Sequence, residues 1–423
     1  MSADFDVAVI GGGSAGVAAA LAAAGEGAQT LLLEASDRLG GNASLALVHT
    51  ICGLFEPAEG EEPARFVHPG LPRRLALALQ AAGVAGEAER AGRVHYLPID
   101  PTGYGGFLAE RCAARAGLQC HLGVALESLT AHDSHVALRW AGGEARARLV
   151  VDATGDGNAA QRLGAERVIE SGDDLQFPSY IVHLSGVDEG VFEGFARLGV
   201  STAMARAVRE GVLPEGCDSV VVRAGLGPGE AFLTLGLPKL PGSDYEPLDP
   251  AYAAELQARA RAAAEAVVAH LRATREPFAR CRVATWPERV GLRETARVRA
   301  RIELDRDDIL AGRRRPDEVV LSAWPIELWR DYRRAHFELP EGPCGVPLGS
   351  LQSASHPRLA VAGRCMGGSH EALGALRVIG TALATGEAAG IACALAADTG
   401  CDLLAVEPAA VRQRIVLAGE GGP

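Results

Sequence analysis

The stretch Gly11-Gly12-Gly13-Ser14-Ala15-Gly16 decides the fold of this chain. It fits the pattern G-x-G-x-x-G, follows the apolar run 6–10, and opens an alanine-rich segment that predicts a helix to about residue 24. A second apolar run, 30–34, ends on Glu34. A strand, a glycine turn, a helix and a second strand of this length predict a βαβ unit of a parallel sheet.

The glycines and the acid of this unit have separate chemical roles. Gly11 permits the tight turn, Gly13 lets the backbone approach a diphosphate, and Gly16 lets the helix pack closely on the strand. The free N–H groups and the positive dipole end at the start of the helix favour phosphate binding. Glu34 is placed to accept hydrogen bonds from a ribose diol. The unit therefore predicts a dinucleotide site.

A glycine pair after Glu34 favours FAD over NAD. The segment Arg38-Leu39-Gly40-Gly41-Asn42 places this pair six or seven residues after the acid, and it resembles the FAD-binding signature of the glutathione-reductase-like superfamily. Ala153-Thr154-Gly155-Asp156-Gly157 resembles the A-T-G segment of the same superfamily. Nicotinamide-binding domains do not normally carry the glycine pair. We therefore expect FAD as the cofactor.

Further blocks resemble the bacterial FAD-dependent oxidoreductase family within that superfamily. They are Gly291-Leu292-Arg293-Glu294-Thr295, the segments 345–351 and 359–365, and the tail 370–390, and they follow the family's order over nearly the whole chain. One departure is Arg364, which stands where related enzymes usually have Asp. The motifs and the resemblance together imply FAD contacts from a set of glycine-rich turns and strand ends. These are Gly11, Gly13, Ser14, Ala15, Gly16, Glu34, Ala35, Arg38, Gly40, Gly41, Asn42, Leu126, Ala153, Gly155, Asp156, Gly363, Arg364, Gly374 and Ala375.

The implied fold is α/β, with a glutathione-reductase-like, Rossmann-type FAD-binding domain split in sequence. Its first part is expected over 1–165, with an insertion at about 43–100, and its closing segment over 346–423. Strand-like runs among Pro/Gly loops, interrupted by one long helix at about 250–273, predict an inserted, mostly antiparallel α+β substrate domain over 166–345. Only one dinucleotide fingerprint occurs, so no dedicated NAD(P)H domain is expected.

Composition and cysteine usage exclude several classes of protein. The formal net charge of −12 argues against nucleic acid as a partner, because phosphate contacts need a basic surface. No apolar run reaches the roughly 18 residues that span a bilayer, and the acidic N-terminus is unlike a secretory signal, so a cytoplasmic location is expected. The nine scattered cysteines contain no C-x-x-C pair, so neither a metal site nor a redox dithiol is expected. Oligomeric state is left open.

Four residues are candidates for chemistry beside the flavin. Arg293 could bind a substrate carboxylate or stabilise reduced flavin, and Glu294 could act as a base, although a structural ion pair is an equal alternative. His370, in the loop after the last strand, could move protons or could only form hydrogen bonds. His49 follows the glycine pair and could face or tether the flavin, although packing is the more common role of such a residue.

The leading functional hypothesis is hydride transfer from an organic substrate to FAD, with oxygen or another acceptor reoxidising the flavin. An alternative is a single-component monooxygenase that hydroxylates a small-molecule or peptide substrate, supplied with electrons by NAD(P)H or a separate reductase. A further alternative is a flavoprotein that modifies RNA or protein. A non-catalytic FAD-binding scaffold is the remaining class.

Overall fold

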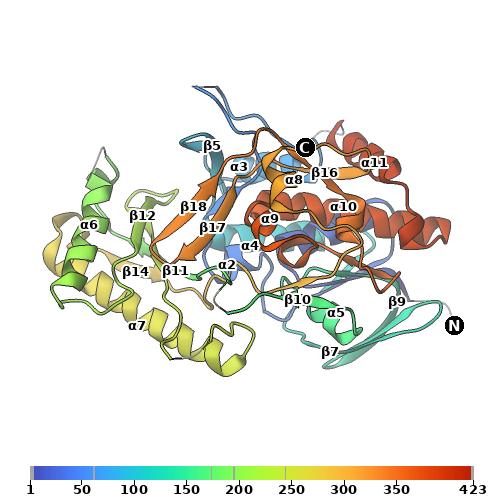
Figure 1. The fold of residues 1–423 in the computed structure, drawn as a ribbon, viewed down its shortest axis with the longest axis horizontal. Coiled ribbons are helices and arrows are strands. Elements are labelled where there is room, and N and C mark those ends of the chain that lie inside the picture. Colours follow the sequence, from blue (N-terminus) through green and yellow to red (C-terminus); the bar gives the residue numbers. More distant parts are fainter. Residues whose placement is uncertain (1–3, 61, 173, 194–195, 243, 421–423) are drawn as a thin grey trace.

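A parallel sheet built on the glycine turn forms the centre of the larger lobe (Figure 1). The structure is a computed structural model that describes residues 4–60, 62–172, 174–193, 196–242 and 244–420. Its main sheet has the order β6-β2-β1-β9-β8-β7, and β20 also pairs with β9. The strands are β1 (Phe5–Ile10), β2 (Thr30–Leu33), β6 (Leu118–His121), β7 (Leu126–Ala131), β8 (Val136–Trp140), β9 (Gly143–Asp152) and β20 (Leu359–Val361).

The long strand β9 brings distant parts of the chain together. Its first half pairs antiparallel with β8, as the Gly142-Gly143 hairpin signal predicts, and its second half pairs in parallel with β20. Strands β1, β2, β6, β9 and β20 are all parallel. The carboxyl ends of β1, β9 and β20 therefore lie at one edge of the sheet, where ligands bind in open α/β folds.

Two small-residue helices pack against each other over this sheet. They are α1 (Ser14–Gly25) and α10 (Ile379–Thr399), and both are buried on almost every side. A side chain at Gly386 or Gly390 would overlap the carbonyl oxygen of Ala15 or Ala19, so glycine is needed where the two backbones meet. By length and hydropathy α10 could cross a membrane, but 89% of its apolar window is buried inside the protein.

The remaining elements of the larger lobe surround these helices. They are α2 (Asn42–Leu45), β3 (Thr50–Cys52), α3 (Leu71–Ala81), β4 (Glu89–Ala91), β5 (Val94–Pro98), α4 (Pro101–Ala113), α5 (Asn158–Arg162), α8 (Arg306–Leu310), β16 (Glu318–Ser322), β17 (Ile326–Asp331), β18 (Arg334–Glu338), β19 (Cys344–Pro347), α9 (His370–Leu376) and α11 (Pro408–Glu420). Strand β10 (Arg167–Ile169) pairs with β15 (Ala296–Val298) where the chain leaves and re-enters this lobe.

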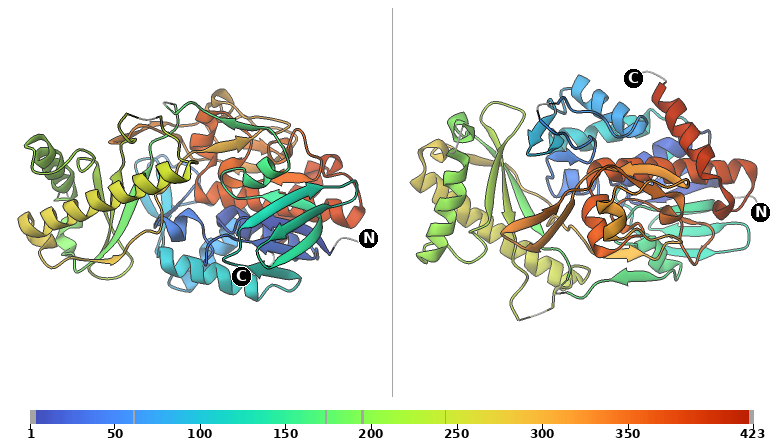
Figure 2. Two further views of the ribbon diagram at one scale, coloured as in Figure 1. Left: turned by 90° about the horizontal axis from the view of Figure 1, so that it is seen from below. Right: turned by 45° about the horizontal axis from the view of Figure 1, so that its top comes forward.

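A second hydrophobic core, from Leu175 to Val290, defines what we call the inserted lobe. Its antiparallel sheet has the order β12-β13-β11-β14. Figure 2 shows from two sides that this lobe, coloured green to yellow, lies beside the body that contains both blue and red segments. Its elements are β11 (Ser179–Ser185), α6 (Ala196–Arg209), β12 (Val220–Ala224), β13 (Glu230–Gly236), α7 (Pro250–Thr274) and β14 (Arg282–Thr285).

The expected α/β class with a parallel, Rossmann-like core is confirmed. The residues that make up the two hydrophobic cores can be compared with the expected bounds of the domains. Most buried apolar residues between Leu304 and Val346 belong to the first core. Tyr332 contacts the inserted lobe, through hydrogen bonds with Asp218 and Ser219. The expected boundaries at 165/166 and 345/346 therefore do not coincide with the second core, which spans 175–290.

Candidate functional site

A cavity of about 400 Å³ lies where the glycine turn, the glycine pair and the ends of β9 and β20 meet. Its wall contains most of the residues that the sequence indicates for FAD. These are Gly11, Gly13, Ser14, Ala15, Glu34, Ala35, Gly40, Gly41, Asn42, Leu126, Ala153, Gly155, Asp156, Gly363 and Arg364.

The glycines of the cavity floor have different reasons to be glycine. Gly11 has a φ of +100°, and a side chain there would lie 2.6 Å from the carbonyl oxygen of Ala153. Gly41 also has a positive φ, and a side chain there would lie 2.9 Å from the Cα of Gly13. A side chain at Gly13 would meet only Gly41, at 3.8 Å, so no neighbour in the protein requires glycine there. The free space beside Gly13 fits a diphosphate that approaches the backbone at the start of α1.

Glu34 marks one end of the cavity. Its Oε2 accepts a hydrogen bond from the Gly12 N–H at 2.5 Å, and its Oε1 accepts from the Ser36 N–H at 2.7 Å and hydroxyl at 2.6 Å. Val124 donates its N–H to the Glu34 carbonyl at 3.0 Å, which places Leu126 nearby in the same wall. An ionised carboxylate has further lone pairs, so Glu34 can accept from a ribose hydroxyl as well.

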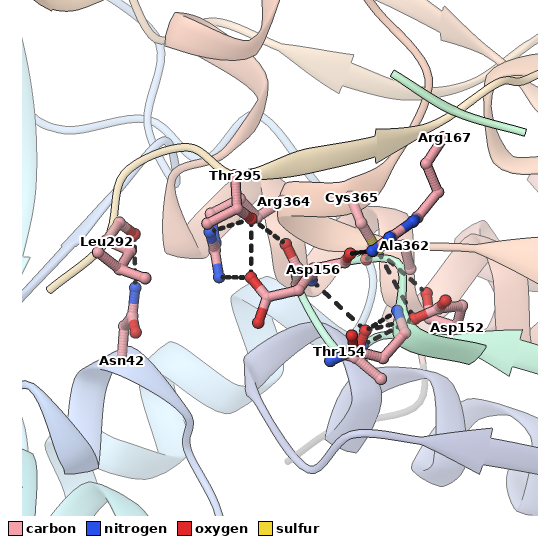
Figure 3. A network of polar contacts seen from close by, with 12 residues as sticks. Asn42, Asp152, Thr154, Asp156, Arg167, Leu292, Thr295, Ala362, Arg364 and Cys365 are labelled. Atoms are coloured by element: carbon pink, nitrogen blue, oxygen red, sulfur yellow. Dashed lines mark hydrogen bonds and ion pairs between the residues drawn. The ribbon is translucent and has the colours of Figure 1, made fainter. Parts of the chain in front are cut away.

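A polar cluster around Arg364 ties three segments of the chain together (Figure 3). Arg364 donates to Asp156 Oδ1 at 2.7 Å and to Thr295 Oγ1 at 2.7 Å, and the Thr295 hydroxyl donates to Asp156 Oδ1 at 2.7 Å. The arginine that replaces the usual Asp after Gly363 thus finds its counter-charge in the loop after β9. Because Asp156 and Arg364 line the cavity, the cluster fixes this part of its wall.

Arg289 enters the same cavity from the inserted lobe. Its guanidinium Nη2 lies 3.9 Å from the position that a side chain at Gly41 would take. Enclosure by the protein, followed by the charge of Arg364, lowers the pKa of Arg289, although the side chain is exposed to the cavity itself. The sequence motifs did not indicate Arg289; its only signal is that it lies two residues before Gly291, where the motif of the family begins.

Arg377 and Ile379 form the other end of the cavity, at the start of α10. Arg377 donates to the Glu327 carbonyl at 3.2 Å and to Gln176 Oε1 at 3.4 Å. Arg293 lies behind this end, with its guanidinium 4.0 Å from the centre of the Trp329 ring, and burial followed by the charge of Arg377 lowers its pKa to about 9. This region is therefore rich in enclosed positive charge.

A single carboxylate, Glu327, accompanies these cations within the described residues around Arg293. Burial would raise the pKa of Glu327, but Arg377, the Trp329 N–H and Arg293 outweigh burial and hold the pKa below its usual value. Glu327 also accepts from the Trp324 N–H at 3.0 Å. Its charge is thus fully engaged by its neighbours.

Glu294 and His370 form a buried pair away from the cavity. His370 Nδ1 lies 2.8 Å from Glu294 Oε2, and Arg297 donates to Glu294 Oε1 at 2.8 Å and also pairs with Glu170. Burial would lower the pKa of His370, but its hydrogen bond to Glu294 raises the pKa above the ordinary value. His370 and Arg297 border a different cavity, of about 570 Å³, so the pair braces the junction beside the FAD cavity.

His49 lies against the inserted lobe. Its ring stacks on Phe232 of β13, with 4.3 Å between the ring centroids, and Phe232 also stacks on His183 of the neighbouring strand β11. Burial, with a further contribution from Arg223, lowers the pKa of His49 to about 3, so the ring is neutral at physiological pH. Burial raises the pKa of the nearby Cys52 thiol to about 12, which leaves it protonated and unreactive.

The structure places eight of the indicated residues outside the cavity wall. Gly16 packs against the Gly11 carbonyl, and Arg38 forms surface ion pairs with Asp37 and Glu288. Gly374 contacts Glu327 on β17, and neither it nor Ala375 borders the cavity. The four chemical candidates Arg293, Glu294, His370 and His49 do not line it either. The wall residues that the sequence did not indicate are Ile10, Leu33, Ala43, Val124, Ala125, Thr154, Asn158, Arg162, Arg289, Ala362, Arg377, Ile379 and Ala382.

The geometry of the cavity fits FAD and defines a class. An acid at one end, a glycine cradle with a helix N-terminus and an arginine in the middle, and cations at the far end suit the ribose, diphosphate and flavin ring in that order. Together with the parallel sheet, this arrangement is that of a flavin-dependent enzyme.

The comparison with protein families agrees. The model of the family described as FAD dependent oxidoreductase matches residues 6–415, and the chain belongs to this family. It is an FAD-dependent oxidoreductase. No curated protein matches the chain in sequence.

Several solved structures have a related arrangement at low identity. A geranylgeranyl bacteriochlorophyll reductase-like protein from Thermoplasma acidophilum is 14% identical over 98% of this chain and 83% of its own, with a TM-score of 0.46. The flavin-dependent brominase Bmp2 is 14% identical over 97% and 83%, with a TM-score of 0.47. OxyS anhydrotetracycline hydroxylase from Streptomyces rimosus is 14% identical over 97% and 65%, with a TM-score of 0.45.

Proposed function

We propose that this oxidoreductase takes a hydride from an organic substrate onto FAD, and that oxygen or another acceptor reoxidises the flavin. The observation that carries the proposal is the enclosed positive charge at the far end of the cavity. Arg377 borders the cavity there and Arg293 lies behind it, with Glu327 as the accompanying carboxylate. Bound FAD supplies the redox chemistry.

The sign of this charge supports a flavin that is readily reduced. A flavin that has accepted a hydride carries more negative charge than an oxidised flavin, so nearby cations stabilise the reduced form. The N-terminus of the 21-residue α10 adds positive potential at the same end. Keeping Arg293 charged costs free energy, as its lowered pKa indicates, and this cost is compensated when negative charge arrives.

The substrate would approach from the inserted lobe. Phe232 and Ile181 on its sheet pack with Leu47, which follows the glycine pair by a few residues. The neutral His49 ring continues this apolar and aromatic wall. Such a wall suits an organic substrate and excludes water from the flavin. We infer that Arg293 and Arg377 also attract any negative charge that the substrate carries.

A second candidate is a single-component monooxygenase supplied by NAD(P)H or a separate reductase. The observation that favours it is the loop Gly155-Asp156-Gly157, which partly resembles the Asp-Gly motif of such hydroxylases and borders the cavity with Gly155 and Asp156. Ala160 and Leu163 stand where that motif has Ser and Arg, which weakens the resemblance.

Anaerobic reduction separates the first proposal from a monooxygenase whose flavin NAD(P)H reduces directly. The FAD-loaded protein is mixed with NADH or NADPH without oxygen while the absorbance of oxidised flavin is followed, with dithionite as the control for a reducible flavin. We expect no bleaching by either nicotinamide and full bleaching by dithionite. Rapid bleaching by a nicotinamide would contradict the first proposal and support the monooxygenase.

A variant tests directly whether the positive charge at the far end of the cavity stabilises reduced flavin. Arg377→Met removes the cation that borders the cavity, and we expect the two-electron midpoint potential of the flavin to fall by about 30–60 mV, which corresponds to a loss of about 1.4–2.8 kcal/mol in stabilising the reduced form. Arg282→Gln, on the exposed strand β14, is the matched control and should leave the potential unchanged. An unchanged potential in the Arg377 variant would remove the support for hydride acceptance.

A further inference from the structure

The segment after β14 leaves the inserted lobe and lies against residues 42–45, which directly follow the glycine pair. The N–H groups of Glu288 and Arg289 point at the Leu45 carbonyl, at 2.8 and 3.3 Å. Asn42 Nδ2 donates to the Leu292 carbonyl at 3.0 Å, as Figure 3 shows. Backbone contacts at both ends therefore hold residues 288–292 over the cavity.

These contacts place the Arg289 side chain in the cavity wall without a direct ion pair, and the charges of Asp156, Glu34 and Glu288 act on it only from farther away. The neighbouring Glu288 is engaged outside the cavity, where it pairs with Arg38 at 2.5 Å. Within the described part of the chain, the Arg289 guanidinium has neither a hydrogen bond nor an ion pair. Arg364, the other arginine in this part of the wall, is neutralised by Asp156 at 2.7 Å.

The position of this charge identifies the ligand group. The guanidinium lies beside Gly41, whose backbone contacts Gly13 at the start of α1. The first turn of α1 carries no acidic residue, and the glycine turn contains no lysine. A dinucleotide that lies along the cavity would bring its diphosphate between Gly13 and Gly41, and a guanidinium fork matches phosphate oxygens.

We propose that Arg289 binds the diphosphate of FAD, and that the inserted lobe thereby takes part in holding the cofactor. The diphosphate is the most negatively charged part of FAD, and Arg289 supplies the positive charge that the glycine turn lacks. This role concerns cofactor binding and is independent of the direction of electron flow.

Titration of the full-length apoprotein with FAD and with riboflavin tests the proposal, because riboflavin lacks the diphosphate. For Arg289→Gln we expect the dissociation constant for FAD, measured by flavin fluorescence, to rise at least tenfold, while that for riboflavin changes less than twofold. Arg289→Lys keeps the charge but loses the fork, so its FAD affinity should fall between those of wild type and Arg289→Gln. Arg282→Gln, from the same lobe, is the matched control and should bind both ligands as wild type does.

Two results would overturn the proposal. One is an FAD affinity of Arg289→Gln within twofold of wild type, and the other is an equal loss for FAD and riboflavin, which would indicate a change in pocket shape. Thermal unfolding of the apoproteins adds a second readout: the variant should be at least as stable as wild type, because burial and the charge of Arg364 disfavour the removed cation more than distant carboxylates favour it. If Arg289→Gln does not fold, Arg289→Lys decides, with a threefold or larger loss for FAD alone as the expected result and equal affinities as the contrary one.

Discussion

At the residue scale, Gly13 and Gly16 belong to one motif but have to be glycine for different reasons. A side chain at Gly16 would overlap the Gly11 carbonyl, whereas one at Gly13 would enter the cavity. Gly13 has φ −67° and ψ 178°, which any residue can adopt. Folding therefore requires Gly16, and cofactor binding requires Gly13.

These constraints predict opposite results for two alanine substitutions. Gly13→Ala should weaken FAD binding at least tenfold while the apoprotein keeps its free energy of unfolding within about 0.5 kcal/mol. Gly16→Ala should destabilise the apoprotein by about 1–3 kcal/mol through overpacking. Fluorescence titration and urea unfolding measure the two quantities. A Gly13→Ala apoprotein that unfolds as easily as Gly16→Ala would contradict the separation.

At this scale, the sequence indicates a residue of the cavity wall where the position of that residue depends on local structure. The positions Gly11, Glu34 and Gly41 could be predicted because a turn, a strand end and a close approach leave direct signatures in the chain. Arg289 could not, since an arginine has no spacing rule and its place depends on how distant segments cross, and Arg377 was indicated only as part of the tail 370–390 that resembles the family. For the same reason Gly374 was expected at the flavin but packs on β17.

At the scale of one element, α10 is an apolar core helix that contains a buried acid. Glu387 is almost fully enclosed, accepts a hydrogen bond from the Leu71 N–H at 2.8 Å, and lies 4.0 Å from Arg74. Burial raises its pKa to about 7, although the Leu71 N–H and Arg74 act in the opposite direction. Glu387 thus holds a proton in the folded state more firmly than in the unfolded chain.

The raised pKa makes stability depend on pH. The stabilisation from the bound proton is complete below the unfolded pKa, about 4.5, and is lost as the pH rises through about 7. Glu387→Gln has no such proton to lose, so between pH 5 and pH 8.5 it should gain about 2–3 kcal/mol in unfolding free energy relative to wild type. Urea unfolding at the two pH values measures the gain. Parallel pH profiles for the two proteins would contradict it.

The bounds of elements were predictable where the pattern is long and regular. The expected helix at about 250–273 is observed as α7, Pro250–Thr274, with Asp249 accepting from the Tyr252 N–H at its start. The last long helix, α10, begins at Ile379, because Val378 is extended. Helices α3 and α6 were not expected, since both lie in segments interpreted as an insertion or as loops around strands.

At the scale of the whole molecule, the cavity is built from parts of the chain that meet only in the folded state. Its wall combines the first βαβ unit, the loop after β9, Arg289 of the inserted lobe, and the segment after β20. Residues 304–345 were expected in the inserted domain together with the strand-like runs and Pro/Gly loops of 166–345. Most of their buried apolar side chains pack in the first core, and a local pattern carries no information about such partners.

This construction predicts that FAD stabilises both lobes together. At a free FAD concentration 100 times the dissociation constant, the free energy of unfolding should rise by about 2.7 kcal/mol. Scanning calorimetry of the protein with and without FAD should show a single transition that moves to higher temperature. A separate transition of the inserted lobe, at a temperature that FAD does not change, would contradict the prediction that both lobes hold the cofactor.

The close packing of α1 on α10 has a consequence for how the protein is made. More than 350 residues separate the end of α1 from the start of α10. At ribosomal rates of about 5–20 residues per second, the alanine-rich face of α1 waits roughly 20–70 s for its partner. The nascent chain therefore carries an uncovered apolar helix and an incomplete cofactor cradle until α10 has left the ribosome, because Arg377, Ile379 and Ala382 complete the cavity wall.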